Sequence, residues 1–188
     1  MAANCEASNR DTKTHGAGVT AILPLPIPGN RGEEALLTGS YDEYVRVYNT
    51  ISKPRILAEE KLGGGVWRLK ILSAPRSRAP CAGEPSERME VIFMVLASCM
   101  HAGVRVLRVA RDGDEKWSIK VLAKFEEHES MNYASDVGPR LNAAGGEENN
   151  AITCVSTSFY DRKLCIWRYE GIGEPQHWSG ESGLAPIA

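Results

Sequence analysis

The stretch Leu37-Thr38-Gly39-Ser40-Tyr41-Asp42-Glu43-Tyr44-Val45-Arg46-Val47-Tyr48 decides the fold of this 188-residue chain. It is typical of a β-strand, a tight turn and a second β-strand. Small residues end the first half, Asp42 occupies the turn, and Val45 and Val47 alternate with polar or charged neighbours after it. The alternation predicts a strand with one face turned toward a core.

The hairpin pattern recurs at 96–107 and at 155–167. Aligned on their turns, Asp42, His101 and Asp161 coincide, and these positions lie 59 and 60 residues apart. A WD-type propeller repeat has a period of about 40–45 residues, so each unit is expected to carry an insertion. No apolar period of 3.6 residues continues far enough to predict a helix. The sequence therefore predicts an all-β chain, a WD-repeat β-propeller with about three blades.

Strand and turn signals divide the chain into three blade units between two irregular ends. The last unit ends at its third strand. Because propellers typically have about four to eight blades, we expect the C-terminal part of a longer propeller of the seven-blade type. A short chain that pairs with a second copy is the alternative. The expected parts are a disordered leader at 1–14, blades at 15–62, 63–125 and 126–170, an insertion at 73–90, a loop at 139–150 and a flexible tail at 171–188.

Composition excludes several classes of function. The net charge of −2 gives no general attraction to nucleic acid or to an anionic membrane. No apolar run approaches the roughly 20 residues of a membrane span, and the polar N-terminus lacks the apolar core of a secretory signal. The five cysteines are scattered, without a CxxC pair or a Cys/His cluster at metal-binding spacing. We therefore expect a cytoplasmic protein with no cofactor and no metal.

Two histidines are expected to act as struts inside the blades. His15 opens the first unit ahead of the Asp42 turn, and His128 opens the third ahead of the Asp161 turn. A turn aspartate can accept hydrogen bonds from turn amides and from a preceding histidine. The second unit departs from this rule, because its turn carries His101 in place of aspartate. Departures from a local rule tend to mark functional positions.

Four motifs, in this order, resemble the C-terminal half of the diphthine methyl ester hydrolase family, which is also named for diphthine methyltransferase. They are Gly39-Ser40-Tyr41-Asp42-Glu43, Gly64-Gly65-Val66-Trp67-Arg68, Ala97-Ser98-Cys99-Met100-His101-Ala102-Gly103 and Ser158-Phe159-Tyr160-Asp161. The resemblance runs from about 15 to 169. It implies a WD-repeat propeller that removes the methyl ester of methylated diphthine, a modified histidine on elongation factor 2. That step leaves the carboxylate that a later ligase amidates in diphthamide biosynthesis.

Ester hydrolysis needs a base, a nucleophile or water, and donors for the oxyanion. The GxSxG and HExxH motifs are absent. The turn and opening loops supply the candidates instead. We expect His101 to be the general base, Arg68 to hold a carboxylate or an oxyanion, and Tyr41 or Tyr160 to donate a hydrogen bond.

Other candidates in these loops have structural alternatives. Gly64 and Gly65 either make a tight turn into a strand or let their amides approach an oxyanion or ligand. Cys99 either packs as a small core residue or acts as a nucleophile beside His101. Trp67 is expected to pack between blades rather than to form a substrate platform.

The residues alone leave other functions open. Many WD propellers are interaction scaffolds without chemistry, and fold does not fix function. A truncated, inactive copy of the enzyme is a further alternative.

Overall fold

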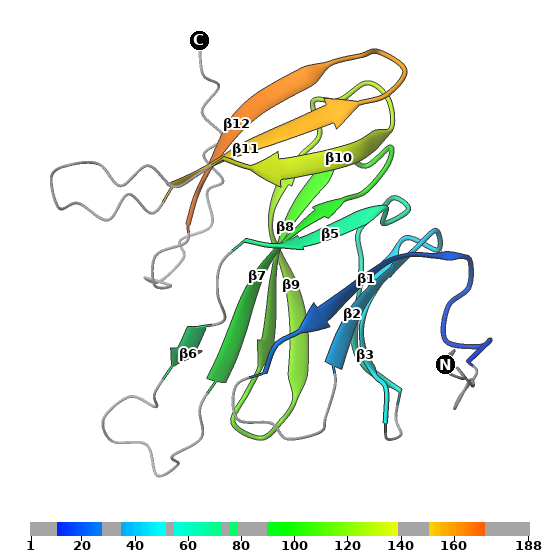
Figure 1. Ribbon diagram of the computed structural model, residues 1–188, viewed down its shortest axis with the longest axis vertical. Helices are drawn as coiled ribbons and strands as arrows, with labels where there is room; N and C mark the ends of the chain where they lie inside the picture. Colours follow the sequence, from blue (N-terminus) through cyan, green and yellow to red (C-terminus); the bar gives the residue numbers. More distant parts are fainter. Residues whose placement is uncertain are drawn as a thin grey trace, which may run out of the picture.

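The computed structural model describes residues 11–27, 35–51, 55–72, 76–78, 90–138 and 151–171. These residues form β-strands and no helix, which confirms the all-β prediction (Figure 1). The strands are β1 (Val19–Leu25), β2 (Ala35–Ser40), β3 (Tyr44–Asn49), β4 (Ile56–Lys61), β5 (Arg68–Ile71), β6 (Arg76–Arg78), β7 (Glu90–Ser98), β8 (Val104–Arg111), β9 (Trp117–Phe125), β10 (Asn132–Val137), β11 (Ala151–Ser158) and β12 (Leu164–Glu170).

The strands form three antiparallel sheets that follow one another in chain order. The first sheet has the order β1-β2-β3-β4, the second β5-β7-β8-β9 with β6 added beside β7, and the third β10-β11-β12. Figure 1 shows the sheets one beyond the other, from blue to orange along the chain. Each is a meander of neighbouring strands, as expected of propeller blades. The arrangement fits part of a β-propeller.

The three predicted hairpins are β2–β3, β7–β8 and β11–β12. In β3, for example, Val45 and Val47 alternate with other residues because every second side chain of a strand points to the same face. Within the described residues the third sheet has three strands, where the first has four. The residues after 171 lie outside the described ranges, so the expectation that the third unit stops at its third strand stays a prediction.

The second sheet is covered on both faces. Along β7, Phe93 and Val95 pack toward the first sheet, whereas Met94 and Leu96 pack toward the third. Both faces are buried, so β7 reads as a nearly continuous apolar run rather than an alternating one. The two cores align the three sheets and therefore fix where their turns meet.

Several predicted segments fall largely outside the described residues. These are most of the leader, most of the 73–90 insertion, the 139–150 loop and nearly all of the tail. At the described end of the leader, Asp11 accepts a hydrogen bond of 3.0 Å from the Tyr48 hydroxyl. Within the insertion, β6 pairs with β7. No helix that could cross a membrane occurs in the described ranges.

Candidate active site

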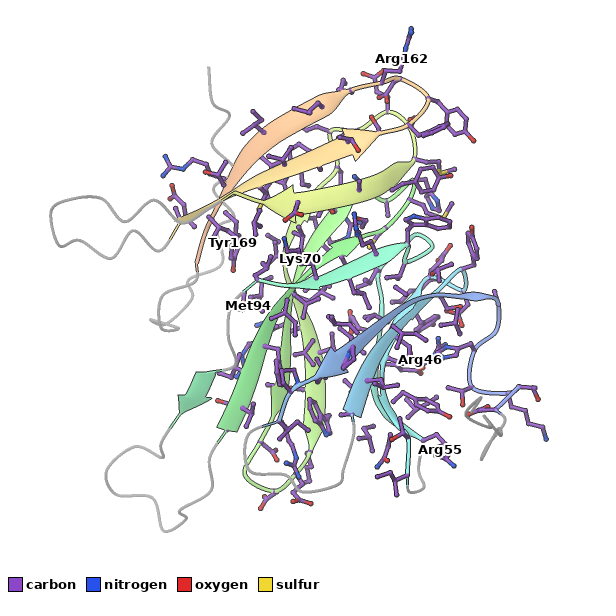
Figure 2. The ribbon with its side chains drawn as sticks, viewed as in Figure 1. Arg46, Arg55, Lys70, Met94, Arg162 and Tyr169 are labelled. Atoms are coloured by element: carbon purple, nitrogen blue, oxygen red, sulfur yellow. The ribbon has the colours of Figure 1, made fainter. Side chains whose placement is uncertain are left out.

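The hairpin turns and the loops that open the next units meet at one end of the sheets. The Ser40 carbonyl accepts a hydrogen bond of 3.0 Å from the Val66 amide, which links the first turn to the second unit. The Met100 carbonyl accepts one of 2.9 Å from the Asn132 amide, which links the second turn to the third unit. Figure 2 shows Arg162 at the tip of the third turn, between β11 and β12. The predicted site residues of the turns therefore belong to one region.

Five aromatic side chains form a continuous series across this region, which we call the aromatic ladder. Successive ring centroids are 6.0, 5.1, 5.8 and 5.2 Å apart, all in edge-to-face arrangement. These separations are typical of attractive aromatic pairs. The members, in spatial order, are Tyr41, Trp67, Tyr133, Phe159 and Tyr160.

The ladder joins two predicted site residues, Tyr41 and Tyr160, through three others. Trp67 packs between sheets as expected, yet it is 39% exposed, so its ring also contributes to the surface. Tyr133 and Phe159 were not predicted as site residues. The signal for them was the placement of an aromatic residue just after the start of β10 and at the third turn, but only the packing of the sheets shows that they touch.

Arg68 takes no part in the ring contacts of the ladder and belongs instead to a charged cluster on β5 and β10. It is the exposed first residue of β5, and Figure 2 shows Lys70 farther along the same strand. Lys70 forms an ion pair with Asp136 of β10. Hydrogen bonds from Lys70 and the Val137 amide lower the pKa of Asp136 against the opposing effect of burial, and the positive charge of Arg68 lowers it further. The charge of Arg68 thus acts on a carboxylate of the chain itself.

His101 is an exposed residue of the turn between β7 and β8. Across the described interactions, none joins its imidazole to Arg68, Tyr41 or Tyr160. The structure therefore links the two tyrosines only through the three other rings of the ladder and does not assemble the four predicted groups into one contact network. The imidazole faces solvent, where a substrate could reach it.

Cys99 is not suited to be the nucleophile. Its side chain is fully buried, and its Sγ donates a hydrogen bond of 3.6 Å to the Ala97 carbonyl. Burial raises the pKa of the thiol to about 12, against a weaker effect of Arg105. A thiol rather than the reactive thiolate is therefore present at neutral pH, and the structural alternative for Cys99 holds.

The two glycines of the opening loop pack against the chain's own turns. A methyl group on Gly64 would lie 2.2 Å from the Cys99 carbonyl oxygen. One on Gly65 would lie 2.7 Å from the Met100 sulfur and 3.1 Å from the Tyr41 ring. The close approach that these glycines allow is thus to the 99–102 turn and to the start of the aromatic ladder.

The first predicted strut, between His15 and Asp42, is not a direct hydrogen bond but runs through the guanidinium of Arg46. Arg46 Nη1 lies 3.2 Å from His15 Nδ1 and donates to both carboxylate oxygens of Asp42. Asp42 also accepts hydrogen bonds from the Gly16 and Tyr44 amides, at 2.8 and 3.1 Å. The expected direct bond from His15 to Asp42 is replaced because the guanidinium, buried beside the turn, lies between the two groups.

The second predicted strut separates into two networks. His128 Nε2 lies 2.8 Å from Ser156 Oγ, which also accepts a hydrogen bond of 3.1 Å from the Trp167 indole. Asp161 instead accepts hydrogen bonds from the hydroxyls of Ser130 and Ser158. The expected direct bond between His128 and Asp161 is not among the described contacts, because the Ser156 hydroxyl pairs with the imidazole and the Ser130 and Ser158 hydroxyls pair with Asp161 Oδ1.

A separate cleft of about 520 Å³ lies between β4 and β9. It is lined by basic side chains, among them Lys61, Lys120, Lys124 and Arg105. None of the predicted catalytic groups lines it. Among the described residues, no group of three His, Cys, Asp or Glu side chains is placed to hold a metal ion.

Comparison with known proteins relates the chain to one group of enzymes. No protein-family model matches it. It is 31% identical over 159 residues to the diphthine methyltransferase of Schizosaccharomyces pombe. This match covers 84% of this chain and 39% of the yeast protein. It is 34% and 30% identical over 125 residues to the diphthine methyltransferases of Mus musculus and Homo sapiens. Those matches cover 66% of this chain and 22% and 23% of the relatives.

The chain thus spans less than half the length of these relatives. The shared region nevertheless takes in most of the chain. The chain is therefore a member of the diphthine methyltransferase family by sequence, and the resemblance carried by its hairpin motifs is confirmed.

Proposed function

We propose that this protein acts in diphthamide biosynthesis, where it hydrolyses the methyl ester of methylated diphthine on elongation factor 2. The observation that carries the proposal is the sequence relation to diphthine methyltransferases. The hairpin motifs that suggest the family lie at the end of the sheets where the hairpin turns and the opening loops meet, which we call the turn-bearing face. A protein-borne side chain could reach that face without entering a closed cavity. The substrate is a whole folded protein, so an open site suits it.

The proposed reaction needs only a water molecule and the ester. Water attacks the ester carbonyl while His101 accepts a proton from it, and the tetrahedral intermediate collapses as the protonated His101 gives that proton to the departing methoxide. The products are methanol and the carboxylic acid of diphthine, which releases its proton to solvent and becomes the carboxylate. Arg68 would stabilise the oxyanion or hold the carboxylate, as a preorganised cation does in acyl transfer. The exposure of His101 supports this role, since its imidazole is open to substrate.

The names of the relatives describe transfer of a methyl group, whereas the proposal describes its removal. Both reactions concern the same modified histidine. They differ in which species accumulates when the activity is lost. Loss of a hydrolase leaves the methyl ester, whereas loss of a transferase leaves a less methylated precursor.

Deletion of the gene separates these reactions and also tests for a scaffold role. The modified histidine peptide of elongation factor 2 is isolated and its mass is measured. Accumulation of the methyl ester is the expected result. An under-methylated precursor would instead support methyl transfer, and normal diphthamide would make this copy a scaffold or an inactive relative. Restoring the gene should return finished diphthamide.

A further inference from the structure

The aromatic ladder exposes a large area of ring surface on the turn-bearing face. Phe159 and Tyr160 are 65% and 69% exposed, and Tyr41 is 48% exposed. Contiguous exposed apolar surface on a soluble protein often marks a binding site. The rings come from three successive sheets, so the two apolar cores fix their relative positions. The ladder is therefore a preformed surface rather than a loose cluster on one loop.

The ladder offers ring faces in several directions. Its neighbouring rings are inclined by 63°, 61°, 72° and 85° along the series. Rings at such angles turn their faces in different directions, whereas parallel rings would cover one another's faces in a flat stack. The face of an aromatic ring is the negative end of its quadrupole. A cation placed against several of these faces would be attracted to each of them.

The hydroxyl groups of the ladder add to this negative character. Burial raises the pKa of Tyr133, and the electrostatic influence of Tyr160 and Tyr41 raises it further. Three phenol groups, that of Tyr41 from the first sheet and those of Tyr133 and Tyr160 from the third, therefore lie close enough to influence one another. Phenol oxygens carry partial negative charge, so their presence on this surface favours a positive ligand.

We infer that the aromatic ladder binds a quaternary ammonium group through cation–π contacts. Such a group has no N–H to donate, so hydrogen-bond acceptors cannot select it and aromatic faces are its usual binding surface. The inference deepens the proposed function and rests on it for the identity of the ligand. Diphthine carries a trimethylammonium group on the carbon next to its carboxyl group. The ladder would hold that cation through the exposed faces of its rings.

A matched pair of small probes tests the charge requirement. Betaine methyl ester contains a trimethylammonium group one carbon from a methyl ester. Methyl 3,3-dimethylbutanoate has the same shape, but a neutral carbon replaces the nitrogen. The proton NMR signal of the nine equivalent methyl protons is followed as each probe is added to the purified full chain. We expect broadening and an upfield ring-current shift for the cation alone.

Variants then assign the binding to the ladder. Phe159→Leu and Trp67→Leu each remove a ring, and each should weaken binding of the cation about two- to fivefold. Tyr160→Phe keeps the ring and should change binding by less than Phe159→Leu does. Leu164→Ala is the control, because Leu164 is an apolar residue of similar exposure (61%) outside the ladder. Circular dichroism checks that each variant is folded. If Trp67→Leu does not fold, Phe159→Leu alone tests whether the ladder binds the cation.

Three outcomes would overturn the inference. They are equal binding of both probes, no shift of either signal, or the same loss in Leu164→Ala as in Phe159→Leu. None of these concerns hydrolysis. If the gene deletion leaves the methyl ester but the cation does not bind, the proposed function stands and the ladder assignment fails. If the cation binds to the ladder but the deletion leaves diphthamide normal, the ladder assignment stands and the proposed function fails.

Discussion

Arg46 directs one guanidinium nitrogen at both carboxylate oxygens of Asp42, with Nη1 3.1 Å from Oδ1 and 2.9 Å from Oδ2. Both side chains are nearly buried, at 8% and 12% exposure. The Nε of Arg46 donates to Glu59 at 3.1 Å, so the guanidinium links the first turn to β4. This ion pair therefore fixes the turn from which Tyr41 starts the aromatic ladder.

Asp42→Asn should lower the free energy of unfolding by about 3 kcal/mol, because a buried guanidinium loses its main counter-charge. Glu43→Gln is the control. Glu43 pairs with Lys61 at 3.2 Å in an exposed ion pair, and its loss should cost less than about 1 kcal/mol. Urea denaturation of both variants gives the comparison. Equal effects of the two substitutions would mean that the Asp42 pair does not carry the stability of this turn.

Ser156→Ala should destabilise the third sheet by about 1–3 kcal/mol, because it leaves buried polar groups of two side chains without their partner. The Trp167 indole donates to Ser156 Oγ, so the hydroxyl proton remains for His128 Nε2. Thr153→Ala changes an exposed residue of the same strand and should cost less than about 1 kcal/mol. The two variants are compared by urea denaturation. A Ser156→Ala protein as stable as the parent would show that this hydrogen-bond network does not contribute to the stability of the third sheet.

The stability of the chain should fall as the pH decreases from about 7 toward 5. Burial lowers the pKa of both His15 and His128 from the usual 6.5, against the attraction of nearby aspartates. A group with a lowered folded-state pKa contributes stability above its unfolded pKa and loses it as the pH falls through the folded pKa. Urea midpoints across this range check the slope.

Ser156→Ala should flatten this pH dependence, because the hydroxyl that donates to neutral His128 is gone. A midpoint that stays constant or rises toward pH 5 in the parent chain would contradict the assignment of neutral His15 and His128.

Gly64→Ala should destabilise the fold by about 1–3 kcal/mol, because the added methyl group would lie 2.2 Å from the Cys99 carbonyl oxygen. Backbone cannot move aside as a flexible side chain can. At Gly138 the nearest atom would be 3.8 Å away, so Gly138→Ala should change stability by less than about 0.5 kcal/mol. Thermal denaturation of the two variants is the measurement. A Gly64→Ala protein as stable as Gly138→Ala would show that the opening loop is free to shift.

The sheets were predictable because their signals are local. Period-two alternation and small turn residues specify each hairpin within about a dozen residues of sequence. The partner of Asp42 was not predictable in the same way, because the sequence indicated His15 and only the packing shows that Arg46 lies between the two groups. The ladder was missed for the same reason. Tyr133 and Phe159 are unremarkable on their own strands, and their contact depends on how neighbouring sheets align.

His101→Ala should lower the rate of ester hydrolysis on methylated elongation factor 2 by about 10²–10⁴-fold if the imidazole is the general base. The reason is that His101 is the exposed titratable group of the second turn, whereas Cys99 beside it is buried and protonated. Arg162→Ala, at the tip of the third turn, is the control and should leave the rate nearly unchanged (Figure 2). Release of methanol from modified elongation factor 2 gives the rate for each variant. A His101→Ala enzyme as fast as the parent would remove His101 from the mechanism and move the search for a base to the charged cluster of Arg68, Lys70 and Asp136.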